Sequence, residues 1–256
     1  MSLSPRSRSL FTYGYTVTDL NSSLDFKASP LDTLPRQARL RTGYYSLTSL
    51  LQEIERALTE KDPTHTYTAT ADRTMNGGTE NRITITSSHT FFRILFGTGP
   101  RAASSCASLI GFQATDYVGG TSYTGSFSTG SHVISTRAGY SYLPPQAIQK
   151  VFGSVNVSAS GLKEAVVFRL QQFWQVEFKY EPESAALTSW ASLLQWLIQQ
   201  RRIEFTPDIA DPLTYYEGTL ERTEDDGKGL GYRLIEMLPD FPREYRTGLM
   251  VFRRIV

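Results

Sequence analysis

The chain is poor in the residues that build redox and metal sites. Its 256 residues include one cysteine, Cys106, and three histidines, His65, His89 and His132. A single cysteine forms no internal disulfide, so the fold has to be stable without covalent cross-links. A zinc site needs three or four converging ligands, and the histidines are far apart in sequence. We therefore expect no metal site, no cofactor, and exposed loop positions for the three histidines.

Long apolar runs and an excess of charge are also missing. No stretch approaches the ~20 apolar residues that are needed to cross a bilayer. The first eight residues include Arg6 and Arg8 but lead into no apolar segment of a secretory signal. The net charge is +1 and the charges are dispersed, which gives no reason to expect nucleic acid as a specific ligand. These absences favour a protein that is made and folded in a cytoplasm and does not insert into a membrane.

The clearest helical pattern runs through residues 187–208. Apolar side chains recur there every three or four positions, at Leu187, Trp190, Leu193, Leu194, Leu197 and Ile198. This spacing places them on one face of an α-helix, which Thr188 or Ser189 can cap. Residues 203–206 then alternate and predict a strand, which ends at Pro207 because proline has no N–H to donate. A helix with one apolar face needs a sheet to cover it.

The first half of the chain predicts a helix followed by three strands. The helix begins after Ser46 and ends before Pro63. Its apolar stripe consists of Leu47, Leu50, Leu51, Ile54 and Leu58. Strand patterns follow at residues 67–72, 82–87 and 91–96, with a tight turn at residues 76–78. We expect these strands to form a three-stranded meander.

Residues 97–142 have a different composition, crowded with glycine, serine, threonine and tyrosine. Only residues 102–110 have the pattern of a short helix. A structureless run of this length is unusual inside a compact domain. We therefore expect an extended arm or insertion over residues 97–145, with a short strand near Val133 and a boundary at Pro144-Pro145. The first nine residues are also expected to be loose until a partner orders them.

Beyond residue 146 strands again surround the helix. They are predicted at residues 151–157, 165–180, 215–222, 232–237 and 249–255. The alternation in the second of these changes phase near Gln171-Gln172, which indicates a bulge.

These patterns predict an α+β fold of two mainly antiparallel β-sheet lobes, sandwich-like, each with one amphipathic helix. Residues 1–96 form the first lobe, residues 97–145 the Gly/Ser/Tyr-rich arm that joins the lobes, and residues 146–256 the second lobe.

Few residues suggest nucleophilic or phosphate chemistry. Cys106 stands at the start of the short helix, where a thiolate can be activated, but no base is paired with it in sequence. A small buried residue beneath Phe112 is the favoured reading. No Gly-x-Ser-x-Gly elbow lies between a strand and a helix. The glycine clusters at residues 97–99 and 227–231 match neither phosphate-binding fingerprint.

Acidic residues cluster in two places, at Asp208 with Asp211 and at Glu224-Asp225-Asp226. Paired carboxylates can carry acid–base catalysis or hold a cation, but aspartate beside proline or glycine more often shapes a turn. We predict no catalytic, cofactor-binding or metal-binding residue. A hydrolase acting through Asp208 and Asp211 is the most distant alternative.

A band of tyrosines lies in and after the glycine-rich segment, at Tyr117, Tyr123, Tyr140 and Tyr142. Exposed tyrosines on polar loops suit contacts with proteins or sugars, and packing explains them equally well. A carbohydrate-binding or receptor-binding module that uses these side chains is therefore the alternative function.

Two groups of segments resemble virion proteins of tailed bacteriophages. In the first half these are residues 43–51, 67–70, 82–86, 92–96 and 109–112. In the second half they are residues 205–208, 215–220 and 245–254, which are similar to the C-terminal part of tail-tip and baseplate proteins, including distal tail proteins. The motifs are loose patterns, and the glycine-rich segment departs from a plain distal tail protein.

The resemblance implies a structural, non-enzymatic subunit of the virion tail that is assembled in the cytoplasm of the host bacterium. Such chains form a homo-oligomeric ring, hexameric or trimeric, around the tail axis. The expected partners are other copies of the chain and further tail proteins, namely tail tube, hub and fibres.

Overall fold

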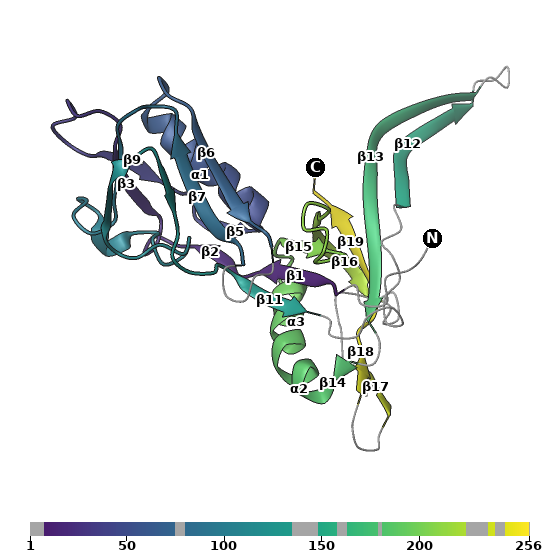
Figure 1. The fold of residues 1–256 in the computed structure, drawn as a ribbon. Coiled ribbons are helices and arrows are strands. Elements are labelled where there is room, and N and C mark those ends of the chain that lie inside the picture. The colour runs from purple at the N-terminus through teal and green to yellow at the C-terminus, as the bar shows by residue number, and fades with distance from the viewer. Residues whose placement is uncertain are drawn as a thin grey trace.

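The computed structural model describes residues 8–74, 80–134, 148–157, 163–178, 181–223, 235–238 and 244–255. It shows a mixed α+β fold rich in antiparallel sheet, which confirms the predicted class. Figure 1 shows two lobes side by side and a long hairpin that projects from the second lobe. The turn predicted at residues 76–78 lies outside the described residues.

The first lobe comprises residues 15–130. Its elements are β2 (Tyr15–Val17), β3 (Ser23–Lys27), β4 (Arg36–Arg39), β5 (Gly43–Tyr45), α1 (Leu47–Lys61), β6 (Tyr67–Asp72), β7 (Arg82–Ser87), β8 (Phe92–Leu95), the short helical turn η1 (Ala102–Ser104), β9 (Asp116–Gly120) and β10 (Ser122–Thr124). They form sheets with the strand orders β4-β3-β8-β9, β10-β7-β6 and β2-β5.

The second lobe holds the remaining elements. These are β1 (Leu10–Tyr13), β11 (Ser131–Ile134), β12 (Ile148–Val157), β13 (Lys163–Phe178), β14 (Glu181–Pro182), α2 (Glu183–Ala185), η2 (Ala186–Trp190), α3 (Ala191–Ile198), β15 (Ile203–Thr206), β16 (Tyr216–Thr223), β17 (Ile235–Leu238), β18 (Glu244–Arg246) and β19 (Gly248–Arg254). Its main sheet has the order β11-β1-β15-β16-β19-β13-β12, and β14-β18-β17 form a smaller sheet.

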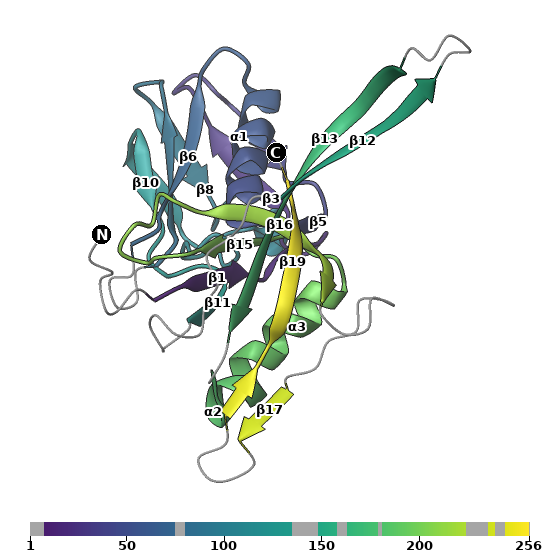
Figure 2. The same cartoon turned by 90° about the vertical axis from the view of Figure 1, so that its right-hand side faces the viewer.

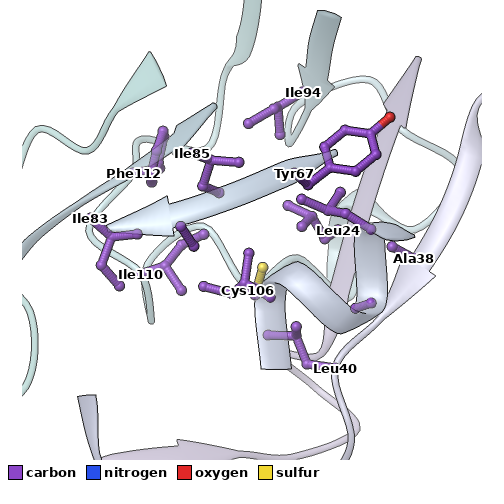
Figure 3. Close-up of a cluster of buried hydrophobic side chains, with 14 of the residues drawn as sticks. Leu24, Ala38, Leu40, Tyr67, Ile83, Ile85, Ile94, Cys106, Ile110 and Phe112 are labelled. Atoms are coloured by element: carbon purple, nitrogen blue, oxygen red, sulfur yellow. The ribbon is translucent and has the colours of Figure 1, made fainter. Parts of the chain in front are cut away.

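The core of the first lobe forms where α1 covers its sheets. The stripe predicted for α1 is buried, and Ser46 caps the helix through a capping box with Ser49. Figure 3 shows Leu24, Ile85, Ile94 and Phe112 converging from different strands and loops beside this helix. The helix and its cap were thus predicted correctly.

The core of the second lobe is built mainly from aromatic rings between the helix and the main sheet. Trp190 and Leu197 are fully buried and belong to the same cluster as Phe11. On the sheet, Trp174 stacks between Phe205 and Phe252, with ring centroids 5.4 and 4.1 Å away. The predicted helix therefore does cover a sheet, as its single apolar face required.

This helix begins earlier than the sequence indicated. The helical stretch starts at Glu183, with a π-helical turn in η2, so Thr188 lies inside it and is not a cap. Its hydroxyl donates to the carbonyl of Ser184. The irregularity in β13 also differs from the prediction: the register shifts opposite Phe152 and Gly153, between Val167 and Arg169, and not at Gln171-Gln172.

Residues 97–134 are not an extended arm. β9 pairs with β8, β10 pairs with β7, and β11 pairs with β1. Their small and polar residues suit edge strands and turns, and a few apolar side chains, such as Ile110 and Phe112, join the core of the first lobe. The meander prediction fails for the same reason, because β10 takes the place beside β7 and β8 pairs with β3 and β9. Residues 135–145 lie outside the described part.

The two lobes are joined by a neck that consists of β1, β11, Gly14 and Gly130. β1 and β11 both belong to the sheet of the second lobe, and Tyr13 lies opposite Ser131. The first lobe is therefore an insertion between two paired strands, and the boundary expected at residue 96 is not where the structure divides. Among the described residues no helix is both long enough and apolar enough to span a bilayer.

The backbone conformation of Gly130, which directly precedes β11, leads to a testable prediction. Gly130 has φ +74°, and a Cβ there would lie 2.7 Å from the ring of the fully buried Tyr15. Gly119 has φ +86° but no atom within 4 Å of an added Cβ. We expect Gly119→Ala to cost about 1–2 kcal/mol for the left-handed backbone alone, and Gly130→Ala to cost more because the clash adds to it. Urea unfolding of both variants measures this; equal losses would contradict it.

Candidate functional site: the lobe junction and the projecting hairpin

The lobes meet where the first turn of α1 faces strands β15 and β16. The backbone N–H of Thr48 donates to the carboxylate of Glu204 on β15, and the hydroxyl of Ser46 donates to Glu217 on β16 at 2.7 Å. The first turn of a helix has unpaired N–H groups and a positive partial charge, which favours carboxylates there. The second lobe therefore supplies anions to the start of a helix that belongs to the first lobe.

Arg73 completes this junction from the first lobe. Its guanidinium lies 3.4 Å from the carboxylate of Glu204 and donates to the hydroxyl of Thr48 at 2.9 Å. The same group lies over the ring of Tyr215, 4.2 Å from the centroid. Glu204 is only 3% exposed, so its charge is compensated by Arg73 and by the helix rather than by water.

A second contact between the lobes is aromatic. Arg201 lies over the rings of Tyr44 and Trp196, at 3.9 and 4.6 Å from the two centroids. Tyr44 and Trp196 also touch edge to face. Trp196 is fixed in turn, because its indole N–H donates to the carbonyl of Arg202. The contact joins β5 of the first lobe to the end of α3.

The hairpin of β12 and β13 is the other distinctive feature. Residues 173–178 of β13 pair with β19, whereas residues 163–172 pair only with β12. At ~3.3 Å per residue this ribbon extends about 30 Å beyond the sheet. Figures 1 and 2 both show it standing away from the rest of the molecule. Among the described strands, the outer edge of β12 has no partner.

The register divides the ribbon into two different faces. Positions that lie opposite each other share a face, and successive positions alternate between faces. One face carries the pairs Val151–Leu170, Gly153–Val167 and Val155–Ala165, followed by Val157 opposite Lys163. The other carries Phe152–Arg169, Ser154–Val166 and Asn156–Glu164. Val157, at the end of β12, is 59% exposed.

The histidines are not simple exposed loop residues. His65 and His89 lie together, with ring centroids 4.4 Å apart, and both are half-buried. His132 is half-buried on β11, and burial lowers its pKa despite the opposing effect of Glu80. The described residues contain no group of three or more His, Cys, Asp or Glu side chains that could hold a metal ion.

Cys106 is fully buried in the same cluster as Phe112, which agrees with the favoured reading. Burial raises the pKa of its thiol to about 12. A thiol in this state carries no thiolate at neutral pH and is a poor nucleophile.

The acidic residues that were considered for hydrolysis shape a turn. Asp208 accepts from the backbone N–H of Ala210, and Asp211 accepts from the hydroxyl of Thr214. Glu224, Asp225 and Asp226 lie outside the described residues, as does the glycine cluster at residues 227–231. In the other cluster, the N–H groups of Gly97 and Thr98 donate to the carboxylate of Asp116.

The tyrosines of the described segment are occupied by packing. Tyr123 is buried and donates to the carbonyl of Phe92, and Tyr117 packs against Phe96 and Phe112. Tyr140 and Tyr142 lie outside the described residues. Among the described residues, this band of tyrosines therefore supplies no exposed side chain for the alternative function, a sugar-binding surface.

No protein-family model and no curated protein matches the chain. The junction and the hairpin are therefore interpreted from their own chemistry.

The structure of the junction predicts that replacing Glu204 destabilises the fold more than replacing an exposed glutamate does. In Glu204→Gln the shape and an acceptor for Thr48 remain, but the charge that faces Arg73 and the helix is lost. We expect a loss of about 1.5–3 kcal/mol, the range for hydrogen bonds to charged groups. Glu221→Gln is the control, since Glu221 is exposed and its nearest cation, Arg253, is 3.8 Å away; its effect should stay within about 0.5 kcal/mol. Chemical denaturation gives both values, and similar losses would refute the importance of the junction.

The environment of Glu217 predicts how the stability of the fold changes with pH. Burial raises its pKa, the charge of Glu204 adds to this, and Ser46, Arg202 and Arg73 oppose it. A raised pKa in the folded state favours folding at low pH, and this contribution is lost as the pH rises through the folded value. Glu217→Gln should therefore be more stable than the original chain at pH 7–8, with the difference vanishing below pH ~4. Thermal melts across this range test it; a variant that is less stable at neutral pH contradicts it.

Proposed function

We propose that this chain is a structural subunit of a tailed-phage virion, which assembles in the host cytoplasm as a ring at the tail tip or baseplate. There it would link the tail tube to hub or fibre proteins, without turning over a substrate. The observation that carries the proposal is the projecting hairpin, and the resemblance of the sequence segments to virion proteins supports it.

The hairpin needs a neighbour for a physical reason. A two-stranded ribbon alone is marginally stable in water, because it lacks a third strand or a helix to cover its apolar face. Here the first ten positions of β13, residues 163–172, have only β12 beside them. One face carries mostly aliphatic residues by register, and the outer edge of β12 is open among the described strands. Such an edge invites pairing or packing with another chain.

A further copy of the same chain is the simplest neighbour. When the hairpin of one subunit packs on a different surface of the next, the contact is head-to-tail, and a head-to-tail contact that closes produces a ring. The lobe junction supports such an assembly, because it holds the first lobe against the second at two separate points. Each subunit would then present its hairpin in a constant orientation.

The hairpin face provides the test. In Val155→Asp a charge is placed on the aliphatic face, and in Asn156→Asp the same side chain is placed at the next position, on the other face. We expect the unaltered chain and Asn156→Asp to form one defined oligomer by size-exclusion chromatography with light scattering, and Val155→Asp to shift to monomer. Burial of a carboxylate against apolar surface is costly. Negative-stain images of the oligomer should show rings.

Three results would count against the proposal. One is a chain that stays monomeric at tens of micromolar, alone and with purified tail-tube protein. Another is immunogold labelling that places the chain on the capsid, or nowhere on the virion. Turnover of a substrate by the purified chain would equally overturn it.

A further inference from the structure

Asp62, the residue that directly follows α1, contacts one histidine of a close pair. Its carboxylate is fully buried, and it accepts from the Tyr67 hydroxyl at 2.6 Å and lies 2.8 Å from Arg36. Thr64 also donates to it, and the ring Nδ1 of His65 lies 2.7 Å away. The carboxylate of Asp62 therefore fixes the ring of His65.

The orientation of His65 follows from this contact. A carboxylate only accepts, so Nδ1 of His65 carries the proton and donates to Asp62. The lone pair of His65 is then on Nε2. Metal-binding histidines commonly have this arrangement, with one ring N–H held by a carboxylate or a carbonyl and the other nitrogen left for the ion.

His89 has a corresponding partner on the turn between β7 and β8. Its Nδ1 lies 2.9 Å from the carbonyl oxygen of Phe91 and also 2.9 Å from the N–H of the same residue. Protonated at Nδ1, the ring donates to the carbonyl and its lone pair is on Nε2. This tautomer keeps the hydrogen bond to the carbonyl but gives up the one that the N–H of Phe91 donates to Nδ1 in the other tautomer, so a metal ion has to select it.

The two rings are close enough to bind one ion. Their centroids are 4.4 Å apart and their planes are inclined by 76°. With metal–nitrogen bonds of about 2.0–2.1 Å, two imidazoles at a right angle around one ion have centroids about 4.5 Å apart, and at the tetrahedral angle about 5 Å apart. The observed separation fits adjacent positions of an octahedral or square-planar site. The side chain of His65 is 25% exposed, so the pair is reachable from solvent.

We propose that His65 and His89 bind a divalent transition-metal ion together, with water completing its coordination. Imidazole suits Ni²⁺, Cu²⁺ and Zn²⁺, whereas Mg²⁺ and Ca²⁺ prefer oxygen ligands. The described residues supply no group of three or more His, Cys, Asp or Glu ligands, so a two-imidazole site is the form that the chain offers. The bound ion would connect the segment after α1 to the β7–β8 turn, and this inference is independent of the proposed ring.

The test is calorimetric titration of untagged protein with NiSO4 and, separately, ZnSO4. We expect saturable binding of one ion per chain. His65→Ala and His89→Ala should each weaken binding by more than the roughly 10–100-fold that loss of an outer-shell partner costs, since each removes a ligand itself. His132→Ala is the matched control and should bind as the unaltered chain does. MgCl2 should produce no saturable heat.

A second measurement guards against misfolding, because His65 is one of the partners of Asp62. Nickel should raise the Tm of the unaltered chain and of His132→Ala, and it should leave the Tm of His89→Gln unchanged, since a ligand that binds only the folded state stabilises it. Binding that survives in both His89 variants would overturn the proposal. So would the absence of saturable binding at millimolar metal.

Discussion

The pairing of β1 with β11 is the constraint on which the architecture depends. Leu10 lies opposite Ile134 and Tyr13 opposite Ser131, so everything between them closes into one loop that contains the whole first lobe. Closing a loop of this length costs entropy, although the cost grows only slowly with length. The first lobe has its own buried core, and β1 also pairs with β15, so both sides of β1 are occupied. The two glycines of the neck let the chain leave and re-enter the sheet without side chains in the way.

The junction then restricts how an inserted lobe can move on its neck. A neck of two strands would allow bending, but Glu204, Glu217 and Arg73 connect the start of α1 to the main sheet. The helix thereby gains anions at its positive end, while Arg73 and the N–H and hydroxyl donors of the helix offset part of the cost of burying these carboxylates. The arginine stack on Tyr44 and Trp196 adds a contact at a separate point. The two lobes are therefore held as one unit by groups that are far apart in sequence.

Several features that depend on residues close together in sequence were predicted correctly from the sequence. The stripe and cap of α1, the strand at residues 203–206 and the burial of Cys106 all follow from spacing and size. The neck has no local signature, because it depends on residues more than a hundred positions apart. The strand near Val133 was predicted, but β9 and β10 were hidden in a glycine-rich composition typical of loops. Glu204 alternates with apolar neighbours, a pattern typical of a solvent-facing position in a strand, yet α1 of the other lobe covers it. The contact between His65 and His89 was invisible for the same reason, since only the fold brings the two turns together.

The edges of the main sheet show why assembly is the natural interpretation of the hairpin. Soluble proteins usually protect exposed edges with short strands, bulges or charges. β11, at one edge, is short and starts directly after Gly130. β12, at the other edge, is ten residues long, and its aliphatic positions follow one another on a single face for most of the projecting ribbon. The single register shift near Phe152 is the one irregularity along that described pairing. An unprotected edge of this length carries an aggregation cost unless another chain covers it. The proposed neighbour would account for both the length of the ribbon and its two unlike faces, whereas a free hairpin accounts for neither.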